Sequence, residues 1–281
     1  MKDFKDRVAV VTGAANGIGR AIAERCAAEG MKVVLAGINE ENLAKVERDL
    51  KARGATVMSV RTDVSKKEDV EALAQKTLDA FGAVHLLVNN AGVGAGTTAW
   101  DSSWNDWEWV IDVNLWGVIH GVKIFTPIML AQKDACHIVN TSSVAGLLAY
   151  HPSATYHMTK HAVVALSENM QLSLEQQNAN VKVSVLCPGW VKTGILDSAR
   201  NRPAHLQNPP VTPTPEQVAA WQSMVEKLEA SMPASEAADH VFKAIVEERF
   251  YVLTHPEYTS MIEERMANLV NGNNPKNPLR Q

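Results

Sequence analysis

The sequence predicts an α/β fold, a Rossmann-like doubly wound parallel sheet of about seven strands with helices on both faces. Two observations predict it. Short apolar runs typical of buried strands alternate along the chain with longer runs of helical periodicity. The first strand also leads directly into a glycine-rich turn that opens a helix.

Short apolar segments are predicted to form the strands, because continuous apolar runs suit strands that are buried on both faces. They are residues 8–12, 32–36, 56–61, 86–88, 137–141, 181–186 and 250–253. The helical patterns are residues 18–29, 39–53, 65–81, 103–132, 156–176, 216–228 and 235–248. Helices between successive strands act as crossovers, so the strands are expected to run parallel.

Some helix ends are marked by capping residues. Ser65 and Glu68 have the spacing of a capping box and are predicted to open the third helix. Ser103 is predicted to cap the long helix of residues 103–132. Pro127 lies inside that pattern and is expected to kink or end the helix.

One domain is predicted to span residues 1–281, because no linker or repeat interrupts the alternation of strands and helices. Residues 194–232 are proline-rich and have no clear period, so we expect a substrate-loop insertion that acts as a lid. From about residue 271 the chain is rich in asparagine, glycine and proline, and a flexible tail is predicted there.

Composition excludes several partners. The formal net charge is -4 without a basic block, so neither nucleic acid nor an anionic membrane is predicted as a partner. We expect no membrane span and no signal segment. A reducing, cytoplasmic compartment is expected from the cysteines. Cys26, Cys136 and Cys187 are widely spaced and are predicted to be reduced, buried thiols. His157 and His161 lie one helical turn apart but lack a third ligand, so no metal site is predicted.

The junction of the first strand and the first helix, residues 12–19, reads Thr-Gly-Ala-Ala-Asn-Gly-Ile-Gly. Side chains at Gly13, Gly17 and Gly19 would hold a phosphate away from the backbone N–H groups and the positive end of the helix dipole. Any tight turn between a strand and a helix can use glycine. The position after the first strand nevertheless favours a site for a dinucleotide pyrophosphate.

Tyr156 and Lys160 lie one helical turn apart and therefore on the same helix face. Each alone would be an ordinary helix residue. An ammonium about 4 Å from a phenol, at an effective dielectric constant of about 20, interacts by about 4 kcal/mol. That interaction could lower the pKa of the phenol from about 10 by up to about three units. The pair is therefore a candidate general acid/base.

Four motifs, in order and in register, resemble those of the short-chain dehydrogenase/reductase family. They are the TGxxxGxG turn at residues 12–19, Asn-Asn-Ala-Gly at residues 89–92, the YxxxK pair, and Pro-Gly-Trp-Val-Lys-Thr at residues 188–193. The similarity extends from residue 6 to about residue 195. Each motif is modest alone, and their common register makes the resemblance specific.

The resemblance implies site residues. The catalytic set would be Asn114, Ser143, Tyr156 and Lys160, with Ser143 favoured over Ser142. Residues implied to bind a nicotinamide cofactor are Gly13, Asn16, Gly17, Ile18, Gly19, Gly37, Ile38, Asp63, Val64, Asn90, Ala91, Gly92, Tyr156, Lys160, Pro188, Gly189, Val191 and Thr193. Thr159 stands where serine is commonest, and this departure is expected to be harmless.

The resemblance also implies a reaction. An NAD(P)-dependent short-chain alcohol dehydrogenase or ketone reductase would move a hydride between nicotinamide C4 and the carbinol carbon, with Tyr156 as general acid/base. Ser143 would hydrogen-bond the substrate oxygen, Lys160 would hold the nicotinamide ribose, and Asn114 would position a water. The alternatives are a non-catalytic, cofactor-binding regulator or scaffold of the same fold, and an epimerase or dehydratase. Non-catalytic relatives usually lack one of the catalytic residues, all of which are present here.

The choice between NAD and NADP is expected to be relaxed. NAD-preferring relatives usually have an acidic residue at the position of Gly37. NADP-preferring relatives often have arginine at the position of Ile38, or a basic residue at the position of Asn16. This chain has neither feature, and the room left by Gly37 predicts a slight preference for NADP.

The substrate is predicted to be a medium-sized secondary alcohol or ketone of largely apolar or aromatic character, rather than a sugar or an acyl-carrier substrate, because the residues expected around it are apolar. The candidates are Val93, Ser143, Ala145, Leu147, Tyr150, Tyr156 and Trp190, with His151 and Ile195 near them. The resemblance further implies a homotetramer or homodimer built by the helices at residues 103–132 and 156–176.

Overall fold

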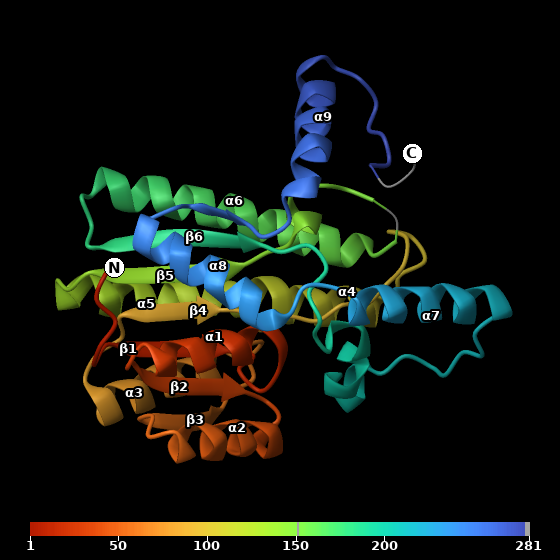
Figure 1. The fold of residues 1–281 in the computed structure, drawn as a ribbon. Coiled ribbons are helices and arrows are strands. Elements are labelled where there is room, and N and C mark those ends of the chain that lie inside the picture. Colours follow the sequence, from red (N-terminus) through yellow and green to blue (C-terminus); the bar gives the residue numbers. More distant parts are fainter. Residues whose placement is uncertain (151, 279–281) are drawn as a thin grey trace.

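A computed structural model describes residues 1–150 and 152–278, and these form a seven-stranded parallel sheet (Figure 1). The strands are β1 (Val8–Thr12), β2 (Lys32–Gly37), β3 (Val57–Arg61), β4 (Leu86–Asn89), β5 (Cys136–Thr141), β6 (Val181–Cys187) and β7 (Tyr251–Leu253). Their order in the sheet is β3-β2-β1-β4-β5-β6-β7. The predicted doubly wound α/β fold is confirmed.

Helices cover both faces of the sheet. One face carries α1 (Gly17–Ala28), α2 (Glu40–Ala52) and α8 (Ala234–Glu247), and the other carries α3 (Lys67–Phe81), α5 (Gly117–Gln132) and α6 (Ala154–Gln176). Because successive strand residues point to opposite faces, Val11 joins the core under the first group and Val10 the core under the second. This sandwich fixes the carboxyl ends of the strands, where the candidate site lies.

A long helical stretch precedes β5 and contains an irregular turn. Ser103 caps α4 (Trp104–Ile111) with a complete capping box, as predicted, and a π-helical turn (Asp112–Trp116) joins α4 to α5. Of the two effects predicted for Pro127, a kink or an end, the end is wrong, since α5 continues through Pro127 to Gln132. The irregularity lies instead at the π turn, and such turns are frequent at functional sites.

The stretch Trp104–Gln132 also corrects the expectation that no run is apolar enough to span a membrane. It has the length and the mean hydropathy, 1.3, of such a helix. Phe125 and Met129 from this stretch are fully buried against the sheet. A core helix of an α/β fold passes the same test of length and composition, so this stretch is weak support for a membrane span.

The predicted capping box at Ser65 is wrong. The Ser65 hydroxyl donates to Asp63 Oδ1 at 2.6 Å, and α3 begins at Lys67 after Lys66, whose side chain makes no capping bond. A serine hydroxyl can bond a nearby backbone or side-chain acceptor instead of a helix N–H. Here the carboxylate two residues earlier provides that acceptor.

The predicted insertion forms two 3₁₀ turns (Ile195–Asn201 and Ala204–Leu206) and α7 (Pro215–Glu229). Nearly all of α7 is exposed and only Leu228 is buried. A further helix, α9 (Thr259–Val270), was not predicted, and it projects from the body of the molecule (Figure 1). Residues 272–278 of the predicted flexible tail fold back along α9, where the Asn273 N–H donates to the Asn268 carbonyl at 2.8 Å. The rest of that tail, residues 279–281, lies outside the described part of the chain.

Candidate active site

The candidate site lies at the carboxyl ends of β1 and β4, which are neighbours although β2 and β3 separate them in sequence. In open α/β sheets this reversal of strand order opens a crevice for ligands. Thr12 and Asn90 tie the two strand ends together. The N–H groups of Asn90 and Ala91 donate to Thr12 Oγ1 at 2.9 and 3.1 Å, and Asn90 Nδ2 donates to the Thr12 carbonyl at 3.0 Å.

The glycine turn packs so closely that side chains would not fit. Gly13 and Gly17 have φ of +67° and +54°, a region in which glycine is favoured. A Cβ at Gly19 would lie 2.4 Å from the Gly13 carbonyl oxygen, and one at Gly17 would lie 2.9 Å from Thr193 Cγ2. Asn16 precedes α1 without a side-chain capping bond. Uncapped N–H groups and a bare backbone fit an anionic pyrophosphate.

The edge of the sheet beyond β1 carries the residues expected near adenosine. Gly37 ends β2 and is buried, and Ile38 after it is 41% exposed. Asp63 follows β3 and accepts from Ser65, and the Val64 side chain packs on Gly117, where a Cβ would approach to 2.7 Å. Ile38 and Asp63 thus lie just after two neighbouring strands, β2 and β3, and the role of these residues near adenosine stays a prediction.

Ser143 lies just after β5, at the end nearest the crevice. Its side chain is buried, and Oγ donates to the Pro188 carbonyl at 3.3 Å and accepts from the Ala145 N–H at 3.1 Å. Ser143 also hydrogen-bonds the side chain of Tyr156. The serine therefore connects the ends of β5 and β6 to the first turn of α6.

Tyr156 lies on the first turn of α6, and its phenol is less acidic than predicted. Burial raises the pKa of Tyr156 above its ordinary value, and the hydrogen bond with Ser143 offsets part of that rise. The expectation that the neighbouring ammonium lowers this pKa is wrong for the structure as it stands. Desolvation of the phenolate outweighs the attraction of the ammonium, because Lys160 Nζ is 5.4 Å from the ring centroid.

Lys160 is buried one turn further along α6. Its Nζ donates to the Thr141 carbonyl at 2.9 Å, and burial lowers the pKa of Lys160 to about 8. The same Nζ lies 3.5 Å from the point where a Cβ of Gly92 would be. A side chain at residue 92 would therefore separate the ammonium from the crevice, and glycine keeps the approach open.

Asn114 lies in the π turn and holds the loop after β4. Its Oδ1 accepts from the Val93 N–H at 2.8 Å, and its Nδ2 donates to the Val93 carbonyl at 2.9 Å and more weakly to Thr159 Oγ1 at 3.4 Å. Thr159 in turn donates to the Tyr156 carbonyl at 2.9 Å. The amide that was expected to position a water is thus engaged with protein groups, and it connects Val93 to α6.

His255 holds the loop after β6 and was missed in the sequence. The Gly189 N–H donates to His255 Nδ1 at 3.2 Å, so Nδ1 is unprotonated and Nε2 donates to the Trp190 carbonyl at 3.0 Å. A Cβ at Gly189 would lie 2.8 Å from the His255 ring. The residues that make these bonds are separated by 66 and 65 positions in the sequence, so no local pattern predicts the bonds.

The other residues of this loop lie against the insertion. Val191 forms a parallel bridge with Met232, and the Lys192 N–H donates to the Met232 carbonyl at 2.9 Å. The Trp190 ring lies 5.1 Å from Lys227 Nζ on α7. The loop after β6, which also contains Pro188 and Thr193, therefore contacts the insertion.

The predicted substrate residues do not form one cluster. Val93 packs with Trp109, Val110 and Leu206, while Leu147 packs with Val164 and Val185 under β6. Tyr150 belongs to a third cluster with Leu148 and Tyr258. Ser143, Ala145 and Tyr156 share the turn between β5 and α6, and His151 lies outside the described residues.

Comparisons with known proteins agree with this geometry. The chain matches the family model described as short chain dehydrogenase over residues 7–204. It is similar to the CLA biosynthesis dehydrogenase/reductase of Lactiplantibacillus plantarum, with 36% identity over 277 residues that cover 98% of this chain and 97% of that protein. It is also similar to a diacetyl reductase ((S)-acetoin forming) of Staphylococcus epidermidis, with 34% identity over 191 residues covering 68% and 74% of the two chains.

A solved structure is also similar to this chain. The structure of a short chain dehydrogenase/reductase from Burkholderia phymatum in complex with NAD matches with a TM-score of 0.95 and 48% identity. The match covers 100% of both chains.

Proposed function

The chain belongs to the short-chain dehydrogenase family, and we propose that it is an NAD(P)-dependent oxidoreductase acting on secondary alcohols and ketones. The observation that carries the proposal is the meeting of Ser143, Tyr156 and Lys160 at the carboxyl end of β5. Ser143 hydrogen-bonds Tyr156, and Lys160 lies beneath the Tyr156 ring, with Nζ 5.4 Å from its centroid. When bound, the nicotinamide supplies or accepts the hydride at C4.

Tyr156 moves the proton that accompanies the hydride. In ketone reduction its hydroxyl gives a proton to the carbonyl oxygen while the carbonyl carbon receives the hydride, so the product is the alcohol. Ser143 Oγ donates a hydrogen bond to that oxygen as negative charge develops on it. The raised pKa of Tyr156 keeps the phenol protonated at neutral pH, which suits reduction. In alcohol oxidation the two transfers reverse.

Lys160 supplies the positive charge that stabilises the phenolate left after proton transfer. With a pKa of about 8 it is mainly charged at pH 7. A buried ammonium acts over a low effective dielectric constant, so its field at the phenolate is strong. Asn114 positions this pair through Thr159. The Thr159 hydroxyl accepts from Asn114 Nδ2 and donates to the backbone carbonyl of Tyr156. The proposed water at Asn114 would complete a relay to solvent.

Gly13, Asn16, Gly17, Ile18 and Gly19 bind the cofactor pyrophosphate in this proposal. The adenosine is surrounded by Gly37, Ile38, Asp63 and Val64. The part of the cofactor between adenosine and nicotinamide lies along Asn90, Ala91 and Gly92. Pro188, Gly189, Val191 and Thr193 hold the nicotinamide, with its ribose bonded by Tyr156 and Lys160. The support is the close-packed glycine turn and the uncapped start of α1.

The cofactor is proposed to be either NAD or NADP, with the slight preference for NADP resting on Gly37. Arg61 pairs with Gly37 in register, but its guanidinium is shared between Asp69 at 3.0 Å and Glu40 at 3.8 Å. No carboxylate at residue 37 repels a 2′-phosphate. The NAD complex of the similar Burkholderia phymatum protein supports binding of NAD.

Replacing Gly37 with aspartate is expected to shift the preference toward NAD. A Cβ at residue 37 meets only Leu43, at 3.8 Å, so the side chain fits. The carboxylate accepts from the ribose hydroxyls and repels a 2′-phosphate, and kcat/KM for NADP should fall at least roughly tenfold relative to that for NAD. The neutral variant Gly37→Asn is the matched control and should shift the ratio less. Before any substitution, a kcat/KM for NAD more than about tenfold above that for NADP would contradict the proposed preference.

His255 is proposed as a positioning residue for the nicotinamide loop. His255→Leu removes the two hydrogen bonds to Gly189 and Trp190, each worth about 0.5–1.5 kcal/mol, so KM for the cofactor should rise roughly tenfold with a smaller change in kcat. His255→Asn keeps an acceptor near Gly189 and should recover part of the loss. Steady-state kinetics with saturating substrate give both constants. An unchanged cofactor KM in His255→Leu would remove this role.

The substrate is proposed to be a medium-sized alcohol or ketone that is largely apolar or aromatic. The apolar character of Tyr150, Val93 and Trp190 supports this class. The diacetyl reductase relative, by its name, reduces a small ketone. A homo-oligomer is also proposed, since Trp116 and Leu172, on the long helices, are 48% and 66% exposed. The free, buried cysteines support a reducing, cytoplasmic location.

The function is tested by offering a panel of ketones with NADH or NADPH, and secondary alcohols with the oxidised forms, while nicotinamide absorbance is followed. Substrate-dependent turnover is expected with at least one ketone and its alcohol. Tight cofactor binding without turnover of any compound would instead favour a non-catalytic regulator or scaffold. Neither binding nor turnover would overturn the proposal altogether.

A further inference from the structure

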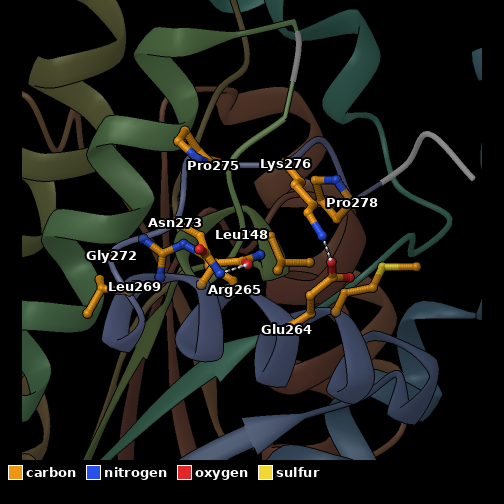
Figure 2. Close-up of a pocket in the computed structure, with 12 residues that line it drawn as sticks. Leu148, Glu264, Arg265, Leu269, Gly272, Asn273, Pro275, Lys276 and Pro278 are labelled. Carbon is orange, nitrogen blue, oxygen red and sulfur yellow. Dashed lines mark hydrogen bonds and ion pairs between the residues drawn. The ribbon is translucent and has the colours of Figure 1, made fainter.

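A cavity of about 390 Å³ lies between α9, the chain that folds back along it, and the turn that follows Ser143. Leu148 and Ala149 form the wall on the side of the catalytic turn (Figure 2). Met261, Arg265 and Leu269 line it from α9. Its size is within the range of small-molecule sites.

The cavity lining has an apolar part and a polar part, and one of its charges is uncompensated. Leu148, Met261 and Leu269 provide apolar surface, together with prolines of the returning chain. Lys276 Nζ lies 3.2 Å from Glu264 Oε1, so these two charges neutralise each other (Figure 2). Arg265 is partly buried and, within residues 1–150 and 152–278, has no hydrogen-bond or ion-pair partner. The cavity therefore carries a net positive charge.

Tyr150 connects this cavity to the catalytic residues. Its ring packs edge-on against His157, with centroids 4.3 Å apart, and His157 is the neighbour of Tyr156. Tyr150 and Met261 also share a cluster with Val144, the residue after Ser143. Burial, with smaller contributions from Tyr156 and Tyr258, raises the pKa of Tyr150, which agrees with a position between those two rings.

We propose that this cavity receives the far end of the substrate, and that this end carries a carboxylate that pairs with Arg265. The inference rests on the proposed function and narrows it. The substrate class is an elongated, mainly apolar oxo- or hydroxy-carboxylic acid, with its carbonyl or carbinol carbon at Tyr156 and its chain passing Tyr150.

The chemistry of the lining selects this class. A guanidinium offers a planar pair of N–H donors that a carboxylate accepts through both oxygens. A neutral end would not pair with the partly buried Arg265 guanidinium, and a cationic end would be repelled by it. Asn268 and Asn273 add amide donors beside Arg265 (Figure 2), and the apolar wall accommodates the chain.

The experiment compares unbranched oxo-acids of several chain lengths with their methyl esters, which keep the carbonyl and lose the charge. Wild type is expected to have a KM for the best acid at least roughly tenfold below that for its ester. Arg265→Met should raise KM for the acid to about that of the ester, with the ester KM and both kcat values within about twofold of wild type. The matched control is Arg53→Met, at the exposed residue that follows α2, and it should alter neither KM.

Four outcomes decide the matter. Equal KM values for acids and esters in wild type overturn the subsite, as does an equal effect of Arg265→Met on both. Turnover of neutral ketones without any oxo-acid also overturns it and leaves the proposed function standing. No turnover of acids, esters or neutral ketones is a failure of the proposed function itself. Thermal melting of each variant confirms that α9 remains folded.

Discussion

Tyr156→Phe is expected to lower kcat by roughly a thousandfold or more, which is the scale of the loss when a general acid/base is removed. The substitution keeps the ring and removes only the hydroxyl that Ser143 hydrogen-bonds. Among residues 1–150 and 152–278, the other hydrogen bonds of the Ser143 side chain are to the backbone groups of Pro188 and Ala145. The dissociation constant of the cofactor should change by less than about threefold, because the glycine turn and the loop after β6 are untouched.

The measurement is steady-state kcat together with a calorimetric titration of the cofactor. Tyr251→Phe is the matched control, because Tyr251 is exposed on β7 and bonds Glu168. The control should retain wild-type kcat. Near-normal turnover of Tyr156→Phe, or an equal loss in the control, would refute the role given to Tyr156.

Lys160→Met should lower kcat by roughly a hundredfold or more while leaving the fold at least as stable at pH 7. Methionine has a similar length and no charge, so the phenolate formed in the reaction loses the field that stabilises it. In wild type the lysine loses its proton as pH rises through about 8. Its kcat for reduction should therefore fall above about pH 8, and the pH profile of the variant should lack this step.

The stability of wild type should rise with pH over the range in which its kcat falls. The folded-state pKa of Lys160 is about 8, below the value of 10.5 expected for an unfolded chain. Between these values the unfolded chain binds more protons than the native protein, so stability rises with pH. The whole shift corresponds to about 3 kcal/mol. Chemical denaturation of wild type and Lys160→Met at pH 7 and pH 10 should give a difference that shrinks toward pH 10, and a constant difference would contradict a charged, buried lysine.

Local patterns predicted most of the fold. The strands are continuous apolar runs, because both faces of the sheet are covered, and this signal needs no tertiary information. The cap at Ser103 formed as predicted, whereas Ser65 found Asp63 as a nearer acceptor. Helix α9 was not predicted because none of its residues is fully buried, and its apolar face is short, with Met261 and Ile262 packed on the cluster around Leu148.

The site was predictable where its geometry is local and not where contacts are distant. Tyr156 and Lys160 are placed by helix spacing alone. The bonds of His255 to Gly189 and Trp190 depend on how β7 meets β6, which sequence spacing does not encode. The pKa of Tyr156 was predicted with the wrong sign, because the cost of burying the phenolate depends on packing that the sequence does not reveal.

The most direct test of the central claim follows the hydride itself. Wild type is given reduced nicotinamide cofactor carrying deuterium at the transferred C4 position, with a ketone that it turns over, and the alcohol is analysed by mass spectrometry and NMR. One deuterium is expected at the carbinol carbon, and the hydroxyl proton should come from solvent. An alcohol without deuterium at that carbon, or with deuterium only when the solvent is deuterated, would contradict hydride transfer at Tyr156.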